Sequence, residues 1–173
     1  DFCDWMNIPF YAVKAQKLFQ EQVMENIVSS RLIGKNHNPC IDCQTLKLRI
    51  LLEKADMLGI EYVATGHYAK IMQHQQNGEF SLLSSNDPEN DQSFQLSRLE
   101  QEQLKRLILP LSEMRKIEVD RISRMIQTEV QDSSKEKGPC FVTDKRFPLY
   151  VEAQAAPSLL QPGTVSDYKT EEV

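Results

Sequence analysis

The sequence lacks several features that would mark common protein classes. No apolar run approaches the length that spans a bilayer, so a membrane-spanning helix is not expected. The first residues carry acidic side chains where a secretion signal carries positive charge, which argues against export. The chain begins with Asp1 rather than methionine, and we expect it to be a fragment of a longer protein.

The sequence also has no excess of positive charge. Its formal net charge is -5, whereas nucleic-acid binders usually carry a basic excess that contacts phosphates. The bulk charge therefore argues mildly against a nucleic-acid partner, although a local basic face can exist on an acidic protein. Hydrophobic residues make up 40% of the chain and charged residues 26%, which indicates a globular rather than a disordered chain.

Cysteine and glycine are both scarce. The four cysteines, Cys3, Cys40, Cys43 and Cys140, are too few for a secreted scaffold of this size, so we expect reduced thiols in a cytosol-like compartment. Cys3 lies among aromatic neighbours and is expected to pack as a small apolar side chain. The first glycine is Gly34, so the preceding residues contain no glycine-rich loop that could cradle a phosphate.

The apolar patterns of the first half predict alternating helices and strands. The expected elements are a strand over 7–13, a helix over 16–32 closed by Gly34, a loop over 34–43, a helix over 45–59, a strand over 60–65, and a hairpin over 70–85 that turns at Asn77-Gly78. A helix, a glycine stop and a short apolar strand are typical of a parallel α/β sheet.

After Asn86 the patterns become mainly helical. The expected elements are a helix over 101–109, a helix over 112–126 with Ser112 as its N-cap, a short strand over 139–142, and a linker from Gln154.

The segment NPCIDC, residues 38–43, is the first candidate for chemistry. Two cysteines separated by two residues suit a metal, a redox pair, a nucleophile with a helper, or two inert packed thiols. A zinc site would need further ligands such as Cys140 and a histidine, and the sequence has no second cluster of this kind. Cys43 is expected immediately before a helix, where unpaired backbone N–H groups favour a thiolate. Lys47 would strengthen this effect and Asp42 would oppose it.

Three further segments are candidates, each with a plainer alternative. ATGHYA would place Gly66 and His67 at the carboxyl end of a strand, where open α/β sheets bind ligands, although strand-end turns of this kind are common. DPENDQSFQLS, residues 87–97, has the composition of a capping and turn segment. GPCFV places Cys140 beside a lysine-flanked polar loop, either as a reactive thiol or as a buried strand residue.

In this order, the four segments resemble those of the tRNA-specific 2-thiouridylases, the MnmA or TrmU family. Residues 38–71 are similar to the family's asparagine-proline loop with its cysteine, the following helix and the ATGHYA strand end. Residues 90–119 are similar to its Lys-Asp-Gln-Ser segment, glutamine-leucine helix and proline-leucine turn, and GPCFV is similar to its Gly-Ile-Cys-Phe segment. The similarity runs from about residue 8 to about residue 165.

The resemblance implies an α/β fold. It would contain a partial PP-loop ATP pyrophosphatase-type (adenine nucleotide alpha hydrolase-like) parallel sheet, then a mainly helical central region and the start of a β-barrel domain. On this basis we divide the chain into three parts. They are a partial nucleotide-binding α/β domain over 1–86, a mostly helical tRNA-contacting region with the Cys140 loop over 87–153, and a linker with the start of a truncated β domain over 154–173.

The resemblance also implies a reaction, the ATP-dependent 2-thiolation of uridine 34 in the tRNA anticodon. One cysteine carries sulfur as a persulfide, and a second thiol releases that sulfur and leaves a disulfide bond. By position, Cys140 matches the persulfide carrier and Cys43 the nucleophile. The other matches are Gly66 for an ATP contact, Asn38, Pro39 and Cys40 for the target base, and His67, Asn90, Asp91 and Gln92 for tRNA contacts.

The implied cofactor is ATP with Mg²⁺, and no tightly bound metal is expected. The implied partners are tRNA and a protein that donates persulfide sulfur, without a membrane. The implied compartment is the cytoplasm, or a mitochondrial or plastid matrix if the source is eukaryotic.

The sequence departs from the family pattern at several positions. The family's Ser-Gly-Gly-Val-Asp-Ser phosphate loop is absent, so we expect the chain to be truncated at both ends and to bind ATP weakly on its own. Asn90 replaces the lysine of Lys-Asp-Gln-Ser, and Cys40 stands where some members have aspartate. Two alternatives therefore stay open. One is an inactive or diverged paralogue that retains tRNA binding, and the other is a zinc-stabilised binding module that uses Cys40, Cys43 and Cys140.

Overall fold

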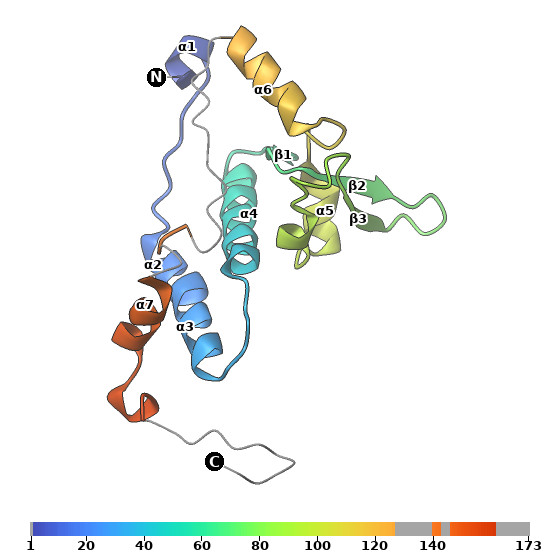
Figure 1. Cartoon of the computed structure of the whole chain (residues 1–173). Coiled ribbons are helices and arrows are strands. Elements are labelled where there is room, and N and C mark those ends of the chain that lie inside the picture. Colours follow the sequence, from blue (N-terminus) through green and yellow to red (C-terminus); the bar gives the residue numbers. More distant parts are fainter. Residues whose placement is uncertain (1, 127–139, 143–145, 162–173) are drawn as a thin grey trace.

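The structure is a computed structural model that describes residues 2–126, 140–142 and 146–161. Its helices and helical turns are α1 (Phe2–Met6), α2 (Gln16–Phe19), η1 (Gln20–Met24), α3 (Glu25–Leu32), α4 (Pro39–Met57), η2 (Ser93–Leu96), α5 (Gln101–Arg106), α6 (Lys116–Met125), α7 (Phe147–Gln154) and η4 (Pro157–Leu159). Its strands are β1 (Val63–Ala64), β2 (Ala69–Gln73), β3 (Phe80–Ser84) and β4 (Leu107–Ile108). Helix α4 lies between α2, α3 and α7 on one side and the β2–β3 hairpin with α5 on the other (Figure 1).

Helices α2 and α3 form one continuous helical run, joined by the π-helical turn η1. This confirms the helix predicted over 16–32. Val23 and Ile27 are fully buried in this run, and Val23 packs against Cys43 and Leu46 of α4. The run closes at Gly34, which adopts a φ of 74°, a left-handed conformation that glycine tolerates without a steric cost.

Helix α4 begins earlier than predicted. The expected loop over 34–43 ends at Asn38, whose side-chain Oδ1 accepts a hydrogen bond from the backbone N–H of Cys40 at 2.9 Å. Pro39 follows as the first helical residue, where its missing N–H costs nothing because that group has no partner inside a helix. Asparagine and proline therefore start the helix here rather than prolong the loop.

The two halves of the chain share one apolar core. Strands β1 and β4 pair in parallel, and α4 packs against them with its buried leucine stripe. The buried members of this core are Leu48, Leu52, Ala55, Val63, Ala69, Leu96, Leu107 and Leu109. The core draws residues from both sides of position 86, and the three-part division of the chain stays a prediction.

The hairpin predicted after His67 is confirmed. Strands β2 and β3 pair antiparallel, with Ala69 opposite Ser84 and Gln73 opposite Phe80. The turn contains Gly78 at a φ of 74°, as the Asn-Gly signal predicts.

Several predicted elements are wrong. Residues 7–13 form no strand, because none of the strand pairings within the described residues includes them. The helix expected over 101–109 stops at Arg106, and the apolar residues that follow pair with β1 as β4 instead. Cys140 and its next two neighbours form a turn and a bend rather than a strand.

Helix α6 also starts later than predicted. Its N-cap is Arg115 rather than Ser112, and Glu118 Oε2 accepts a hydrogen bond from the Arg115 N–H at 2.7 Å. A glutamate three residues into the helix thus satisfies the backbone donor that the serine was expected to serve.

The overall class is a mixed α/β fold with a small parallel sheet. The expected start of a β-barrel falls mainly on residues 162–173, which lie outside the described residues. Within the part of the chain that the structure describes, no helix combines the length and apolar composition needed to cross a bilayer.

Candidate functional site

The first two turns of α4 carry the paired cysteines. Cys43 was expected just before the helix, but it lies inside it, in the second turn. Its side chain is 8% exposed and packs in an apolar cluster with Val23 and Leu46. Cys40 is only partly buried and lies closer to the helix start. The helix N-terminus therefore acts more directly on Cys40 than on Cys43, because its effect fades within the first turn.

The segment with Cys140 meets this end of α4. Cys140 itself is exposed, while its neighbour Phe141 packs against the apolar cluster that contains Cys43. The ring of Phe141 makes edge contacts with Phe19 at 5.8 Å and with Tyr150 at 5.9 Å between ring centroids. The fold thus brings the two cysteine segments together, although they are far apart in the sequence.

Cys40 lies within electrostatic range of both other cysteines of the site. Burial raises the pKa of the Cys40 thiol above its ordinary value of 9.0, and Cys43 and Cys140 raise it further, while Lys47 acts to lower it. Cys40 is therefore a neutral thiol near pH 7, which makes it a proton donor rather than a nucleophile at rest.

The end of β1 lies beside the same stretch of α4. Desolvation lowers the pKa of His67 below its ordinary value of 6.5, and the positive charge of Lys47 lowers it further. The Nδ1 atom of His67 lies 3.0 Å from the Thr65 hydroxyl. The charge of Lys47 acts to lower the pKa of both Cys40 and His67. The start of α4, which carries Cys40 and Cys43, and the end of β1 therefore share one electrostatic environment.

Gly66 leaves open space at the end of β1. A Cβ atom added there would have Leu111 Cδ1 as its nearest neighbour, at an ordinary contact distance of 3.8 Å. The protein itself therefore does not require glycine at this position. A neighbouring cavity of about 480 Å³, lined in part by Lys47, Lys54, Tyr62 and Ala64, opens along the same side of α4.

The segment with Asn90, Asp91 and Gln92 is tied to the strand that follows Gly66. Gln92 exchanges two hydrogen bonds with the backbone of Tyr68, at 3.1 and 2.8 Å. Asp91 accepts hydrogen bonds from Ser85 and Ser93, at distances from 2.5 to 3.2 Å.

These contacts give the segment a structural role. Burial acts to raise the pKa of Asp91, but the hydrogen bonds from Ser93 and Ser85 outweigh it, so its pKa lies below the ordinary value of 3.8. Asn90 donates to Asp87 at 2.9 Å. The capping and turn interpretation of this segment therefore describes the geometry well, and tRNA contact by these residues stays a prediction.

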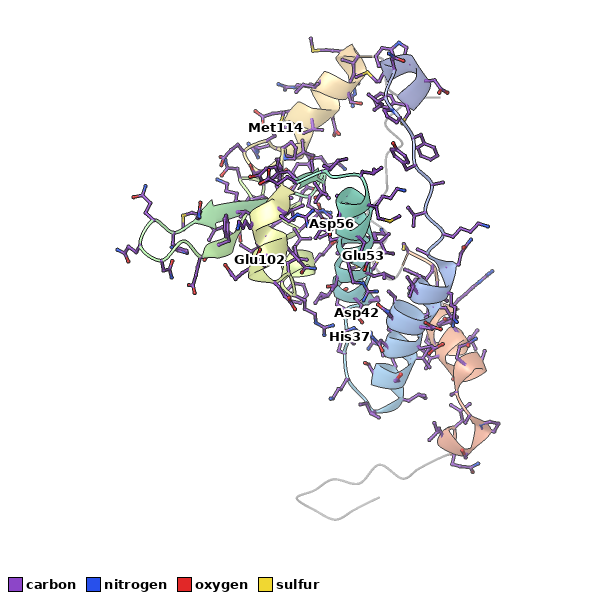
Figure 2. The ribbon with its side chains drawn as sticks, turned by 180° about the vertical axis from the view of Figure 1, so that it is seen from behind. His37, Asp42, Glu53, Asp56, Glu102 and Met114 are labelled. Atoms are coloured by element: carbon purple, nitrogen blue, oxygen red, sulfur yellow. The ribbon has the colours of Figure 1, made fainter. Side chains whose placement is uncertain are left out.

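The sequence did not reveal a buried cluster around Asp42. The Asp42 side chain is 5% exposed and forms an ion pair through Oδ1 with Arg98. Its Oδ2 lies 2.6 Å from Nε2 of His37 and 3.4 Å from Nδ2 of Asn26. Figure 2 shows His37 and Asp42 together at one end of α4, with Glu53 and Asp56 toward the other. The three partners of Asp42 lie in three separate segments, and no sequence pattern links them.

Within the residues that the structure describes, no group of three or more histidine, cysteine, aspartate or glutamate side chains could hold a metal ion. The geometry therefore does not favour the zinc-stabilised module. Gly66 leaves room for a ligand beside its backbone, and Lys47 places a positive charge near the same strand end.

Comparisons with known proteins agree with the sequence pattern. The family model described as tRNA methyl transferase HUP domain matches residues 1–144. The tRNA-specific 2-thiouridylase MnmA of Leptospira interrogans is 40% identical over 149 residues, which cover 85% of this chain and 39% of that protein. The MnmA proteins of Clostridium perfringens and Geotalea uraniireducens are each 36% identical, over 94% and 95% of this chain. The chain spans less than half the length of these curated relatives, 39–45%.

Proposed function

The chain belongs to the tRNA methyl transferase HUP domain family, and from this premise we propose that it takes part in the 2-thiolation of a tRNA uridine. The relatives cited above carry the name tRNA-specific 2-thiouridylase. The observation that carries the proposal is the packing of Phe141, next to Cys140, against the apolar cluster that contains Cys43. Sulfur transfer through two thiols requires such a meeting.

In the proposed reaction, a persulfide donor protein passes its terminal sulfur to the thiolate of Cys140 and keeps its own thiol. The exposure of Cys140 suits this encounter with a macromolecular donor. The terminal sulfur of Cys140 then loses its proton and attacks C2 of the uridine, and the C2–O bond breaks as the activated oxygen leaves with an AMP group. ATP, when bound, would supply this activation by placing the AMP group on the C2 oxygen.

Cys43 completes the transfer. Its thiolate attacks Sγ of Cys140, the bond between Sγ and the terminal sulfur breaks, and that bond's electron pair stays with the sulfur on the uridine. The product is 2-thiouridine with a Cys43–Cys140 disulfide, which a dithiol reductant must reduce before the next cycle. Burial of Cys43 next to Phe141 keeps competing thiols away from this step.

The tRNA-facing side of the site would be the end of α4 together with the end of β1. Asn38 and Pro39 start the helix, and the neutral Cys40 thiol could donate a proton to the base. His67, held neutral near pH 7 by its lowered pKa, could donate or accept a hydrogen bond. This arrangement supports tRNA as the partner, as the names of the relatives suggest.

Removal of the gene from the source organism tests the function. We expect the 2-thiouridine of its tRNA, measured by mass spectrometry of digested nucleosides, to fall to background and to return when the gene is supplied again. Unchanged 2-thiouridine after removal, with no second gene of the family present, would refute the proposal.

Gly66 offers a test of the nucleotide contact. Gly66→Ala should leave the free energy of unfolding within about 0.5 kcal/mol of wild type, because the added Cβ meets no close neighbour. The 2-thiouridine content should nevertheless fall, because a methyl group blocks close approach of a ligand to the backbone. The matched control is Gly59→Ala, at a φ of 68°, which should lose about 1 kcal/mol of stability. Equal 2-thiouridine in Gly66→Ala and wild type would remove Gly66 from the nucleotide site.

A further inference from the structure

The Asp42 cluster, formed by Asp42, His37, Asn26 and Arg98, holds a buried carboxylate that the proposed reaction does not use. Asp42 lies between Cys40 and Cys43 in the chain, so its side chain fixes the rotation of the turn that carries both thiols. A carboxylate with its side chain 5% exposed is stable only where its charge is balanced, and the Arg98 guanidinium and the His37 imidazole provide its partners here.

We propose that the ion pair between Arg98 and Asp42 holds the first two turns of α4, which carry both cysteines, with Cys43 against Phe141, so that Cys43 rather than Cys40 forms the bond with Cys140. This inference rests on the proposed function, in which Cys43 resolves the persulfide of Cys140. Arg98 and Asp42 are positioning residues, because they act through the helix and not on the sulfur atoms.

The location of the cluster supports this role. Helix ends fray, and both cysteines lie in the first two turns of α4, where Asn38 alone would hold the start of the helix. Asp42 makes three further contacts at this end of α4. They are with His37 in the loop before the helix, with Asn26 in α3 and with Arg98 just after η2. Without them, rotation or fraying of the first turn would expose Cys40 before it exposes Cys43.

The cluster also connects the start of α4 with the other segments of the proposed site. Arg98 follows η2, and the same stretch is bonded through Gln92 to the backbone of Tyr68 at the start of the hairpin. The ion pair therefore fixes the start of α4, with Cys40 and Cys43, relative to the hairpin start at Tyr68 and to residues 90–92. A displacement of about 1 Å in such an arrangement can cost about a hundredfold in rate.

The chain provides a matched control at the other end of α4. Arg106, at the end of α5, forms an ion pair with Asp56 of α4 at 2.6 Å. Arg98 likewise forms an ion pair with an aspartate of α4, Asp42. The two arginines differ in which end of the helix they hold. Arg98→Ala and Arg106→Ala each remove one positive charge and one ion pair with an aspartate of α4, and Arg106→Ala also removes hydrogen bonds to the carbonyl oxygens of Ile60 and Glu61.

The experiment uses the reduced 173-residue chain and limiting diamide as the oxidant. Two thiols join as a disulfide and pass two electrons and two protons to diamide, which becomes the hydrazine. Mass spectrometry of acid-quenched digests then gives the rate of the Cys43–Cys140 bond and its share relative to Cys40–Cys140. Thermal unfolding of each reduced variant is measured in parallel.

We expect Arg98→Ala to slow the Cys43–Cys140 bond about tenfold and to raise the share of Cys40–Cys140. Arg106→Ala should change the rate by less than about twofold, since its bond lies far from the thiols. Arg98→Lys, which keeps the charge but loses the planar fork, should give an intermediate rate. Asp42→Asn should match Arg98→Ala if both fold, because the neutral amide no longer needs the guanidinium. If the thermal unfolding shows that either variant is not folded, Arg98→Lys, which keeps a positive charge beside the buried carboxylate, decides.

Two results would overturn the positioning role while leaving the thiol pair intact. One is an equal slowing in Arg98→Ala and Arg106→Ala, and the other is an unchanged ratio of the two disulfides in Arg98→Ala. If the wild-type chain never links Cys43 to Cys140, the assignment of the working thiols fails, and the positioning role fails with it.

Discussion

Replacing Cys140 with serine is expected to remove 2-thiouridine from the tRNA of cells that carry the variant, a loss of about a thousandfold or more. Serine has no sulfur, so it cannot accept the terminal sulfur of a persulfide donor. The exposure of Cys140 means that little packing is lost with it, and the free energy of unfolding should stay close to wild type. The measurement is 2-thiouridine per tRNA by mass spectrometry, together with the protein level.

Cys43→Ser should give a loss of similar size by a different route. Cys140 should still accept persulfide sulfur in this variant, because its side chain is exposed and unchanged. Release of the sulfur to the uridine should stop, since no neighbouring thiolate takes over the bond to Sγ of Cys140. Cys140 that carries the extra sulfur, as a persulfide or joined through that sulfur to the uridine, should therefore accumulate, whereas both species should be absent from Cys140→Ser.

Cys3→Ser is the control for both variants. It removes a partly buried thiol on α1, outside the meeting point of α4 and Phe141, so 2-thiouridine should remain at the wild-type amount. Substantial 2-thiouridine in either Cys43→Ser or Cys140→Ser would rule out the two-thiol reaction.

Leu96→Ala should be among the most destabilising single substitutions in the chain. Leu96 is 1% exposed and packs from η2 into the core shared by α4 and the β1–β4 sheet. Truncation of a fully buried leucine to alanine costs about 2–5 kcal/mol through lost burial and the cavity left behind. Urea unfolding followed by circular dichroism gives this difference, because both proteins should share the same slope with denaturant.

Leu83→Ala provides the matched comparison. Leu83 lies on β3 and is 39% exposed, so its truncation should cost less than about 1 kcal/mol. Equal destabilisation by the two substitutions would mean that η2 does not contribute to the core as the structure indicates.

The parts of the fold that were predicted correctly are those governed by local pattern. The leucine stripe of α4 and its stop near Gly59 follow from helical periodicity and from glycine's tolerance of a left-handed conformation. The β2–β3 hairpin follows from alternating apolar residues on either side of Asn77-Gly78. Each of these signals acts within one element, so it is visible without the rest of the structure.

The errors arose where a distant segment decided the outcome. Residues 107–109 continue a helical pattern in the sequence. The first two of them nevertheless pair in parallel with β1 and form strand β4. Residues 7–13 have the composition of a strand, yet no strand among the described residues pairs with them. Local propensity is a weak guide wherever pairing across the chain competes with it.

The candidate site residues rest on residue types and on the resemblance, and their roles stay predictions. Cys40, Cys43 and Cys140 were identified from their neighbours and from the resemblance, but the packing of Phe141 beside Cys43 has no sequence signal. Asp42 was expected to oppose a thiolate at Cys43. The structure pairs its carboxylate with Arg98 and places it 2.6 Å from Nε2 of His37.

Helix α4 is fastened at both ends by arginines from one neighbouring stretch, through Asp42 at its start and Asp56 near its end. Arg106 also donates to the carbonyl oxygens of Ile60 and Glu61, just beyond the helix. Sliding of the helix along its axis would have to break both attachments together. The helix is thus a fixed reference within the described part of the molecule, and in the proposed sulfur transfer Cys43 would keep its place relative to the segment from η2 to α5.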